Sequence, residues 1–204
     1  MYKLKLGFDI DHVINLQFEN TRDMIFSKYG IKLKTEMAST DAITSLVYDN
    51  DYYTNKSISD DIRKTIYDIR FQCQATPSIS ALRTINSLKE NGAEIYFITS
   101  RRVGTEKFTI KWLNDWGFKY DYLYHTGING KDNIPKGIFA NELCLDFFID
   151  DRYKNIVDMQ NYRRNWNIGL YLIDRPWNIH KPTPTGVKRI KNFVDVLHLI
   201  KVFM

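Results

Sequence analysis

Cysteine is scarce in this chain: Cys73 and Cys144 are the only two among 204 residues. Two cysteines are too few for a disulfide framework, and their spacing is not that of metal ligands. The sequence also lacks any apolar run close to the roughly 20 residues that a membrane-spanning helix needs. Because Asp9 and Asp11 interrupt the first apolar stretch, we expect no secretory signal peptide. These absences predict reduced thiols and a cytoplasmic protein without a membrane partner.

Concentrated charge of one sign is also missing. The formal net charge is +5 and the pI is near 9.0, but the basic residues are dispersed along the chain. The densest basic group, residues 188–191, is expected on the solvated face of a C-terminal helix. This charge suits a small phosphorylated substrate, and we expect no stable nucleic-acid partner. A homo-oligomer remains open.

Short apolar runs with β-branched or aromatic residues predict five strands. Their approximate ranges are 3–9, 94–99, 121–125, 146–150 and 168–173. Apolar residues at helical spacing lie between them, at 78–91, 105–116 and 135–143. Strands that alternate with helices of this length predict an α/β fold with a Rossmann-like, doubly wound parallel sheet.

One segment does not follow this alternation. Residues 15–77 contain helical patterns around 17–29 and 58–72 but no convincing sheet strand. We interpret this segment as a small helical cap inserted after the first strand. The predicted core domain then consists of residues 1–14 and 78–204.

Carboxylates follow two of the predicted strands. Asp9 and Asp11 end the first apolar run, and Asp150 and Asp151 end a later one. Parallel strands deliver such residues to the carboxyl edge of the sheet, where open α/β proteins bind their ligands. Oxygen ligands from more than one chain segment suit Mg²⁺. Taken alone, either pair could be surface acids at a strand end, but the matched positions favour a magnesium site for phosphate chemistry.

Three motifs together resemble those of the haloacid dehalogenase-like (HAD) phosphohydrolases. They are an apolar strand followed by Asp-x-Asp at 7–11, a strand ending in threonine at 96–99, and an acidic pair after a strand at 148–151. The resemblance extends from residue 3 to about residue 178. Thr105, Trp112, Leu113 and residues 174–178 further resemble the branch related to 5′(3′)-deoxyribonucleotidases.

The resemblance implies roles for the four acids. Asp9 would be the nucleophile that forms an aspartyl-phosphate, and it would also bind the metal. Asp11 would be the general acid and then the general base, and its backbone carbonyl would bind Mg²⁺. Asp150 would be the side-chain metal ligand, with Asp151 as an alternative ligand or a partner of the ligands.

The resemblance also implies residues that hold the substrate. Thr99 and the backbone N–H of Ser100 would bind phosphoryl oxygens. From its position after the strand, Arg101 either binds a phosphate or a base or is an exposed charge. The lysine of the third motif is either Lys136 or Lys131. Lys136 is preferred because of its distance from Asp150 in the sequence, and Lys131 fits the wider superfamily pattern.

One position departs from the family pattern. The residue after Asp-x-Asp is usually glycine, and here it is His12. His12 is either a functional contact or a tolerated substitution.

The function that these motifs predict is a Mg²⁺-dependent phosphatase. It would act on a small phosphomonoester, with a nucleoside monophosphate as the favoured substrate. A sugar phosphate or a nucleic-acid 3′-phosphate would preserve the chemistry with a different substrate. A non-catalytic binding module on the same scaffold is the alternative of another class.

Overall fold

The sheet of the computed structural model contains six strands, all parallel, in the order β3-β2-β1-β4-β5-β6. The structure describes residues 2–33, 55–128, 133–162 and 168–200. The strands are β1 (Lys5–Phe8), β2 (Glu94–Arg102), β3 (Tyr122–Gly127), β4 (Phe147–Asp150), β5 (Gly169–Ile173) and β6 (Val187–Ile190). The prediction of a doubly wound parallel sheet is confirmed.

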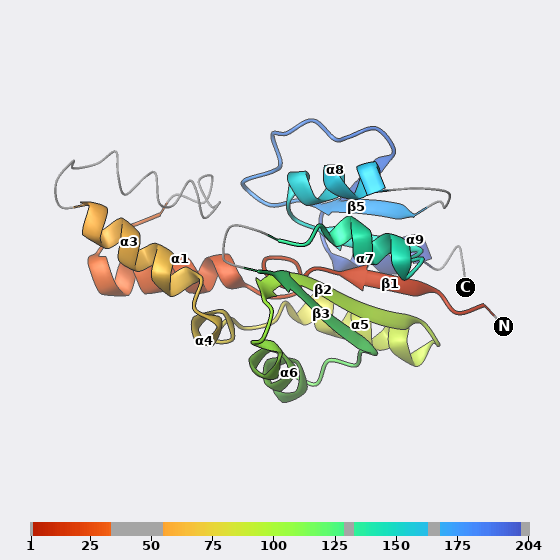
Figure 1. The fold of residues 1–204 in the computed structure, drawn as a ribbon, viewed down its shortest axis with the longest axis horizontal. Coiled ribbons are helices and arrows are strands. Elements are labelled where there is room, and N and C mark those ends of the chain that lie inside the picture. The colour runs from red at the N-terminus through yellow and green to blue at the C-terminus, as the bar shows by residue number, and fades with distance from the viewer. Residues whose placement is uncertain (1, 34–54, 129–132, 163–167, 201–204) are drawn as a thin grey trace.

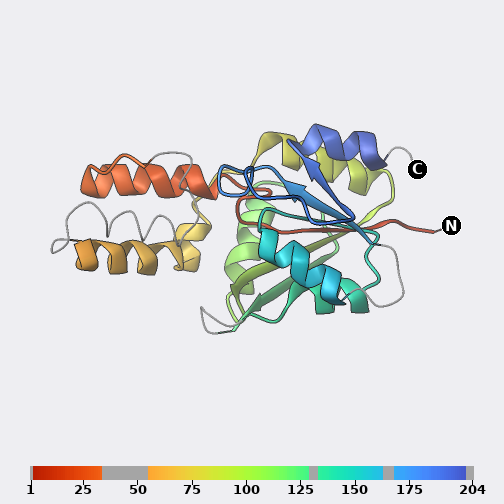
Figure 2. The same ribbon diagram turned by 90° about the horizontal axis from the view of Figure 1, so that it is seen from above.

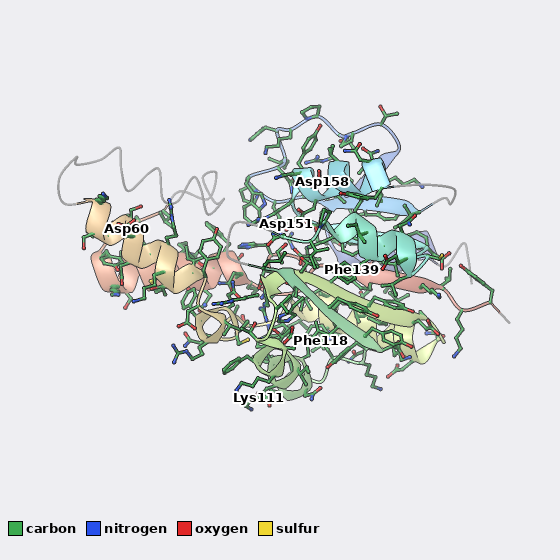
Figure 3. All side chains as sticks on the ribbon, in the orientation of Figure 1. Asp60, Lys111, Phe118, Phe139, Asp151 and Asp158 are labelled. Atoms are coloured by element: carbon green, nitrogen blue, oxygen red, sulfur yellow. The ribbon has the colours of Figure 1, made fainter. Side chains whose placement is uncertain are left out.

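Helices cover both faces of the sheet (Figures 1 and 2). One face carries α5 (Ile79–Glu90), α6 (Glu106–Asp115) and α9 (Phe193–Ile200); the other carries α7 (Lys136–Glu142) and α8 (Tyr153–Tyr162). Alternate residues of each strand supply the two cores, because successive side chains point to opposite faces. Ile95 of β2 joins the first core, for example, and Tyr96 joins the second. Figure 3 labels one residue from each side of the sheet: Phe118 lies in the first core, and Phe139 packs against the second.

The predicted helix over residues 188–191 is wrong. Val187–Ile190 form β6, an edge strand that pairs with β5, and α9 begins only at Phe193. Val187 and Ile190 are three residues apart, and in a strand this places them on opposite faces of the sheet, where each joins a different core. The same spacing in the sequence imitates one apolar face of a helix. Lys188 lies exposed between them.

In the described part of residues 15–77, three helices follow β1 and project from the sheet. They are α1 (Gln17–Tyr29), α3 (Asn55–Ile66) and α4 (Ile69–Gln72). Figure 2 shows α1 and α3 side by side, extending away from the sheet. Buried apolar residues from α1 and α3 form a small core of their own: Phe18, Ile25, Ile62 and Ile66. No helix in the described ranges is both long and apolar enough to cross a membrane.

The chain leaves the sheet and returns to it at one place. Asn15 and Pro77 form an antiparallel bridge. The N–H of Leu16 donates to the carbonyl of Thr76 at 2.8 Å, and the N–H of Ser78 donates to the carbonyl of Ile14 at 2.8 Å. These contacts lie near the predicted ends of the cap. The division of the chain into domains at these residues stays a prediction.

The 58–72 helical pattern corresponds to two helices. Asp68 separates them, and its carboxylate accepts the N–H of Arg70 as the N-cap of α4. The described part of the cap therefore ends in the short helix α4 before the chain returns to the sheet.

Gly7 in β1 faces the side chain of Phe148 in β4, with which it pairs. A Cβ at this position would lie 2.4 Å from Cδ2 of Phe148 and 2.7 Å from Cδ1 of Leu145. We expect Gly7→Ala to lower the free energy of unfolding by about 2 to 3 kcal/mol, because the core must shift to admit the methyl group. Chemical denaturation of both proteins would measure this. The loss should shrink in a Phe148→Val background, which shortens the obstructing side chain; an equal loss there would place the cause elsewhere.

Candidate active site

Three carboxylates gather where β1 and β4 end. Asp9 directly follows β1, Asp150 ends β4, and Asp151 comes next. One oxygen of each of the three lies within 4.8 Å of the others, and all three side chains are buried. Asp9 continues the strand ladder, since its N–H donates to the carbonyl of Ile149 at 3.0 Å. Figure 3 labels Asp151 at the junction of the cap and the sheet. The name "acid cluster" is used below for Asp9, Asp150 and Asp151.

Lys136 compensates part of this negative charge. It is the first residue of α7, after Pro135, and is 4% exposed. Its Nζ lies 2.8 Å from Oδ1 of Asp9 and 2.8 Å from Oδ2 of Asp150. Burial alone lowers the pKa of Lys136, but the charges of Asp150 and Asp9 raise it above the ordinary value, so the ammonium stays charged. Lys131, the other predicted lysine, lies outside the described residues.

Asp150 is held by further donors. The backbone N–H of Arg152 donates to Oδ1 at 2.8 Å, and the side-chain amide of Asn155 donates to both carboxylate oxygens, at 3.1 and 3.0 Å. Asn155 lies in the first turn of α8. The sequence analysis did not identify it, although its position five residues after a strand-end acid is a usable signal.

Asp11 pairs with Arg101 rather than with Lys136. The guanidinium donates from Nε to Oδ2 at 3.0 Å and from Nη2 to Oδ1 at 2.7 Å, and Nη1 donates to the hydroxyl of Thr109. The Arg101 side chain is fully buried. Burial raises the pKa of Asp11, but the charge and hydrogen bonds of Arg101 outweigh it and lower this pKa to about 2. Binding of a substrate by Arg101 stays a prediction; in this structure its guanidinium holds Asp11.

Thr99 and Ser100 lie in β2, which continues to Arg102 rather than ending at residue 99. The hydroxyl of Thr99 is buried and accepts the N–H of Arg101 at 3.4 Å. Because β2 is the direct neighbour of β1, both residues lie toward the sheet edge that carries Asp9. Their predicted contacts with a phosphoryl group stay predictions.

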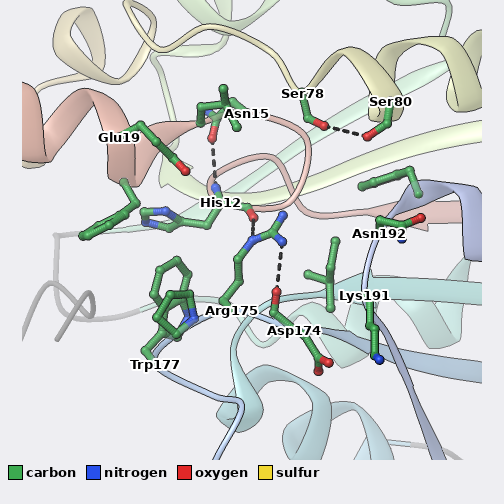
Figure 4. Close-up of a pocket in the computed structure, with 15 residues that line it drawn as sticks. His12, Asn15, Glu19, Ser78, Ser80, Asp174, Arg175, Trp177, Lys191 and Asn192 are labelled. Atoms are coloured by element: carbon green, nitrogen blue, oxygen red, sulfur yellow. Dashed lines mark hydrogen bonds between the residues drawn. The ribbon is translucent and has the colours of Figure 1, made fainter. Parts of the chain in front are cut away.

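His12 has a left-handed backbone conformation, with φ of 65°. Glycine adopts this conformation without steric cost, which explains why glycine is usual here in the family. Two contacts hold the histidine in place: its N–H donates to Oδ1 of Asn15 at 2.9 Å, and its carbonyl accepts Nε of Arg175 at 2.6 Å (Figure 4). Burial lowers the pKa of the imidazole to about 4, so the ring is neutral at physiological pH.

The segment after β5 also reaches the acid cluster. The indole N–H of Trp177 donates to Oδ2 of Asp151 at 2.8 Å, and the side-chain amide of Asn178 donates to the carbonyl of Asp151 at 2.7 Å. Sequence reasoning identified residues 174–178 through their resemblance to the deoxyribonucleotidase branch, but it did not predict these bonds. The sequence did contain a signal for these contacts, because the segment directly follows a strand. That strand, β5, lies beside β4, so the segment begins close to Asp151.

A pocket of about 320 Å³ lies beside this arrangement. Figure 4 shows it between the loop after β1, the segment after β5, and the starts of α5 and α9. Its described lining includes His12, Arg175, Trp177 and Lys191, but no member of the acid cluster. The pocket therefore adjoins the acid cluster from the side of the Trp177 ring.

The charges of the acid cluster are incompletely balanced within the described residues. Burial, followed by the charges of Asp150 and Asp9, raises the pKa of Asp151 to about 8. Burial also raises the pKa of Asp9 to about 6, against the opposing effect of Lys136. Oδ1 of Asp151 is buried and accepts no hydrogen bond from the residues that the structure describes. Buried carboxylate oxygens gathered in this way suit a hard divalent cation such as Mg²⁺.

This electrostatic arrangement predicts a pH-dependent stability. An acid whose folded pKa is raised binds more protons in the native state than in the unfolded state, so stability falls as pH rises through the interval between the two values. For Asp151 that interval runs from its ordinary value of 3.8 to about 8, and Asp9 has the same sign up to about 6. We expect the Tm of the metal-free protein to fall between pH 5 and pH 8.5, and Mg²⁺ to restore it at the upper end.

Asp151→Asn tests the origin of this effect. The amide does not titrate, so the variant should melt at a higher temperature than the wild type at pH 8 in a chelator, and should gain less from Mg²⁺. Asp158→Asn in α8 is the matched control. Parallel Tm–pH curves for the wild type and Asp151→Asn would contradict the assignment.

Comparison with solved structures identifies the class of fold. The chain has the fold of the HAD-superfamily hydrolases, which confirms the predicted resemblance at the level of architecture. A HAD family hydrolase from Deinococcus radiodurans R1 with bound phosphate and sodium matches with a TM-score of 0.70 and 12% identity, over 98% of this chain and 96% of that one. A magnesium-bound structure from Bacillus subtilis, described as a "putative HAD-hydrolase", matches with a TM-score of 0.59 and 13% identity, over 98% and 99%.

One relative found by sequence has a name that specifies an activity more narrowly. A Bacillus cereus protein named "Putative nucleotidase" is 25% identical over 206 residues, which cover 97% of this chain and 98% of that protein. No family model matches the chain.

Proposed function

We propose that this protein is a Mg²⁺-dependent phosphatase that hydrolyses a small phosphomonoester through an aspartyl-phosphate. The observation that supports it best is the acid cluster, with the ammonium of Lys136 2.8 Å from both Asp9 and Asp150. A carboxylate nucleophile, a cation and an oxygen donor set at one sheet edge are the parts that phosphoryl transfer requires. Phosphate and a cation bound in the Deinococcus structure are consistent with this chemistry.

The first step is attack by Asp9. A carboxylate oxygen of Asp9 bonds to phosphorus, the bond from phosphorus to the ester oxygen breaks, and the leaving oxygen takes a proton from Asp11. Asp11 begins as a carboxylate beside Arg101; the approach of a phosphate dianion raises its pKa, so that it takes up a proton from solvent before donating it. Lys136 and the donors at Thr99 and Ser100 would stabilise the charge on the phosphoryl oxygens.

The second step hydrolyses the aspartyl-phosphate. Asp11, again a carboxylate, takes a proton from water, the water oxygen bonds to phosphorus, and the bond from phosphorus to Asp9 breaks. The products are inorganic phosphate and a free Asp9 carboxylate, and Asp11 returns to its starting carboxylate by releasing its proton to solvent as the phosphate leaves. The two hydrogen bonds from Arg101 hold Asp11 in its ionised form and fix the orientation of its carboxylate before it accepts this proton.

Asp9, Asp150 and Asp151, with the backbone carbonyl of Asp11, would hold the metal. When bound, Mg²⁺ offsets repulsion among the carboxylates and polarises the phosphoryl group. The buried, unpaired Oδ1 of Asp151 supports this assignment of ligands.

The substrate that we favour is a nucleoside monophosphate. Two observations support it: the name of the Bacillus cereus relative, and the resemblance of Thr105, Trp112, Leu113 and residues 174–178 to the deoxyribonucleotidase branch. A sugar phosphate would use the same site and the same two steps.

The test is phosphate release from a panel of nucleoside monophosphates and sugar phosphates, each with Mg²⁺ and with a chelator. The expected result is release that requires Mg²⁺, with nucleotides as the best substrates. Faster release from sugar phosphates would overturn the substrate assignment alone. No release from any member would count against a phosphatase of this range.

A further inference from the structure

The segment after β5 is fixed to the protein at both ends. Arg175 donates from Nε to the carbonyl of His12 at 2.6 Å. Asn178 is buried, and its side-chain amide donates to the carbonyls of Asp151 and Ile173, at 2.7 and 2.8 Å. Nη2 of Arg189 in turn donates to the carbonyl of Asn178 at 2.8 Å. Trp177 lies between these two anchors, so the backbone that carries it is well supported.

The ring of Trp177 is also held on its faces and edges. Its centroid lies 4.8 Å from that of His12 at an interplanar angle of 69°, and 6.0 Å from that of Phe18 at 60°. Both are edge-to-face arrangements, which aromatic pairs prefer. Figure 4 shows Trp177 beside His12 at one side of the pocket. The position of the indole N–H is therefore determined by packing rather than by its bond to Asp151 alone.

That N–H occupies one of the two oxygens of Asp151. It donates to Oδ2 at 2.8 Å, and Oδ1 is buried with no hydrogen bond from any described residue. A carboxylate with one oxygen bonded to a fixed donor cannot rotate freely about its last torsion. Oδ1 is thus the oxygen of Asp151 that stays available to the acid cluster.

We propose that Trp177 is a positioning residue for the divalent cation, which orients Asp151 so that Oδ1 is presented to the metal. The inference rests on the proposed function, since it assumes that the acid cluster binds Mg²⁺. Partners that orient metal ligands typically contribute 10- to 100-fold to metal affinity, because they fix the ligand before the metal arrives. An indole supplies one donor on a rigid ring, so its removal should act on affinity directly.

The test compares Mg²⁺ binding by isothermal titration calorimetry, without substrate, in the wild type and Trp177→Phe. Phenylalanine keeps an aromatic ring for His12 and Phe18 but lacks the N–H. We expect the variant to bind Mg²⁺ about 10- to 100-fold more weakly. Trp116→Phe is the matched control, because Trp116 lies exposed at the end of α6 and should leave the affinity unchanged. Equal affinities in the wild type and Trp177→Phe would overturn the proposal.

The titration separates this inference from the proposed function. A wild type that binds no Mg²⁺ would contradict the metal site itself, whereas a wild type that binds and a Trp177→Phe variant that binds equally well would contradict only the role of Trp177.

A second measurement does not depend on whether Trp177→Phe folds. The chain has four tryptophans, so the indole N–H resonances of the wild type can be assigned with single Trp→Phe variants, and the resonance of Trp177 by elimination. The Trp177 resonance should shift when Mg²⁺ is added, and that of Trp116 should not. A Trp177 resonance that ignores Mg²⁺ at saturation would overturn the proposal.

Discussion

Asp9→Asn should reduce phosphate release by at least about 10⁴-fold while the protein remains folded. The amide is nearly isosteric with the carboxylate but is a poor nucleophile, so the aspartyl-phosphate cannot form. Asp9 is also buried, with its pKa raised by burial, so loss of its charge removes an unfavourable desolvation. The measurement pairs the phosphate-release assay with a thermal melt, and the variant should melt within a few degrees of the wild type.

Two comparisons make this result specific. Asp60→Asn changes an exposed acid of the cap and should retain wild-type turnover. Rapid acid quench of the wild type with labelled substrate should trap label on the protein, and Asp9→Asn should trap none. Normal turnover in Asp9→Asn would exclude Asp9 as the nucleophile.

Lys136→Ala should have the second largest effect, on rate and on stability together. The ammonium lies 2.8 Å from an oxygen of Asp9 and from an oxygen of Asp150, and all three groups are buried. Its removal leaves two buried carboxylates without their counter-charge, which typically costs about 3 to 5 kcal/mol. We expect phosphate release to fall by about 10²- to 10³-fold, the effect of losing one donor to developing charge. Denaturation in a chelator and in Mg²⁺ would measure the stability.

Lys131→Ala is the variant to compare with Lys136→Ala. Both lysines are candidates for the third motif, and only Lys136 lies within the described residues in contact with the acid cluster. If Lys136 has the proposed role, Lys131→Ala should stay within about threefold of the wild-type rate. The reverse ranking of the two variants would assign the third motif to Lys131.

The sheet could be predicted from the sequence because its central strands are buried on both faces. Such strands are continuous apolar runs, as in residues 95–98 and 147–149, and a run followed by a helical pattern defines each unit. The edge strand β6 could not be predicted in this way. Its two buried residues serve opposite faces, with the exposed Lys188 between them, so that neither strand alternation nor a long apolar run is present.

The site likewise contains some features that could be predicted from the sequence and others that could not. Asp9, Asp11, Asp150 and Asp151 could be predicted to lie near one another because each stands at the end of a strand of one parallel sheet or just after it. The bond from Arg101 to Asp11 could not, because the predicted strand ended at residue 99 and β2 continues past Arg101. The contact of Trp177 with Asp151 depends on β5 lying next to β4, which is a property of strand order rather than of local sequence.

The cap leaves the sheet and returns to it at neighbouring residues. Because Asn15 and Pro77 are bridged, residues 16–76 connect two adjacent points of the chain, as a short turn would. Insertions are tolerated where their ends lie close together, because the loop-closure entropy grows only slowly with length. The cap could therefore be lengthened, shortened or exchanged over evolutionary time without altering strand order or the register of β1 with β4. On this scaffold, the inserted segment can change in length while Asp9, Asp150 and Asp151 keep their positions at the sheet edge.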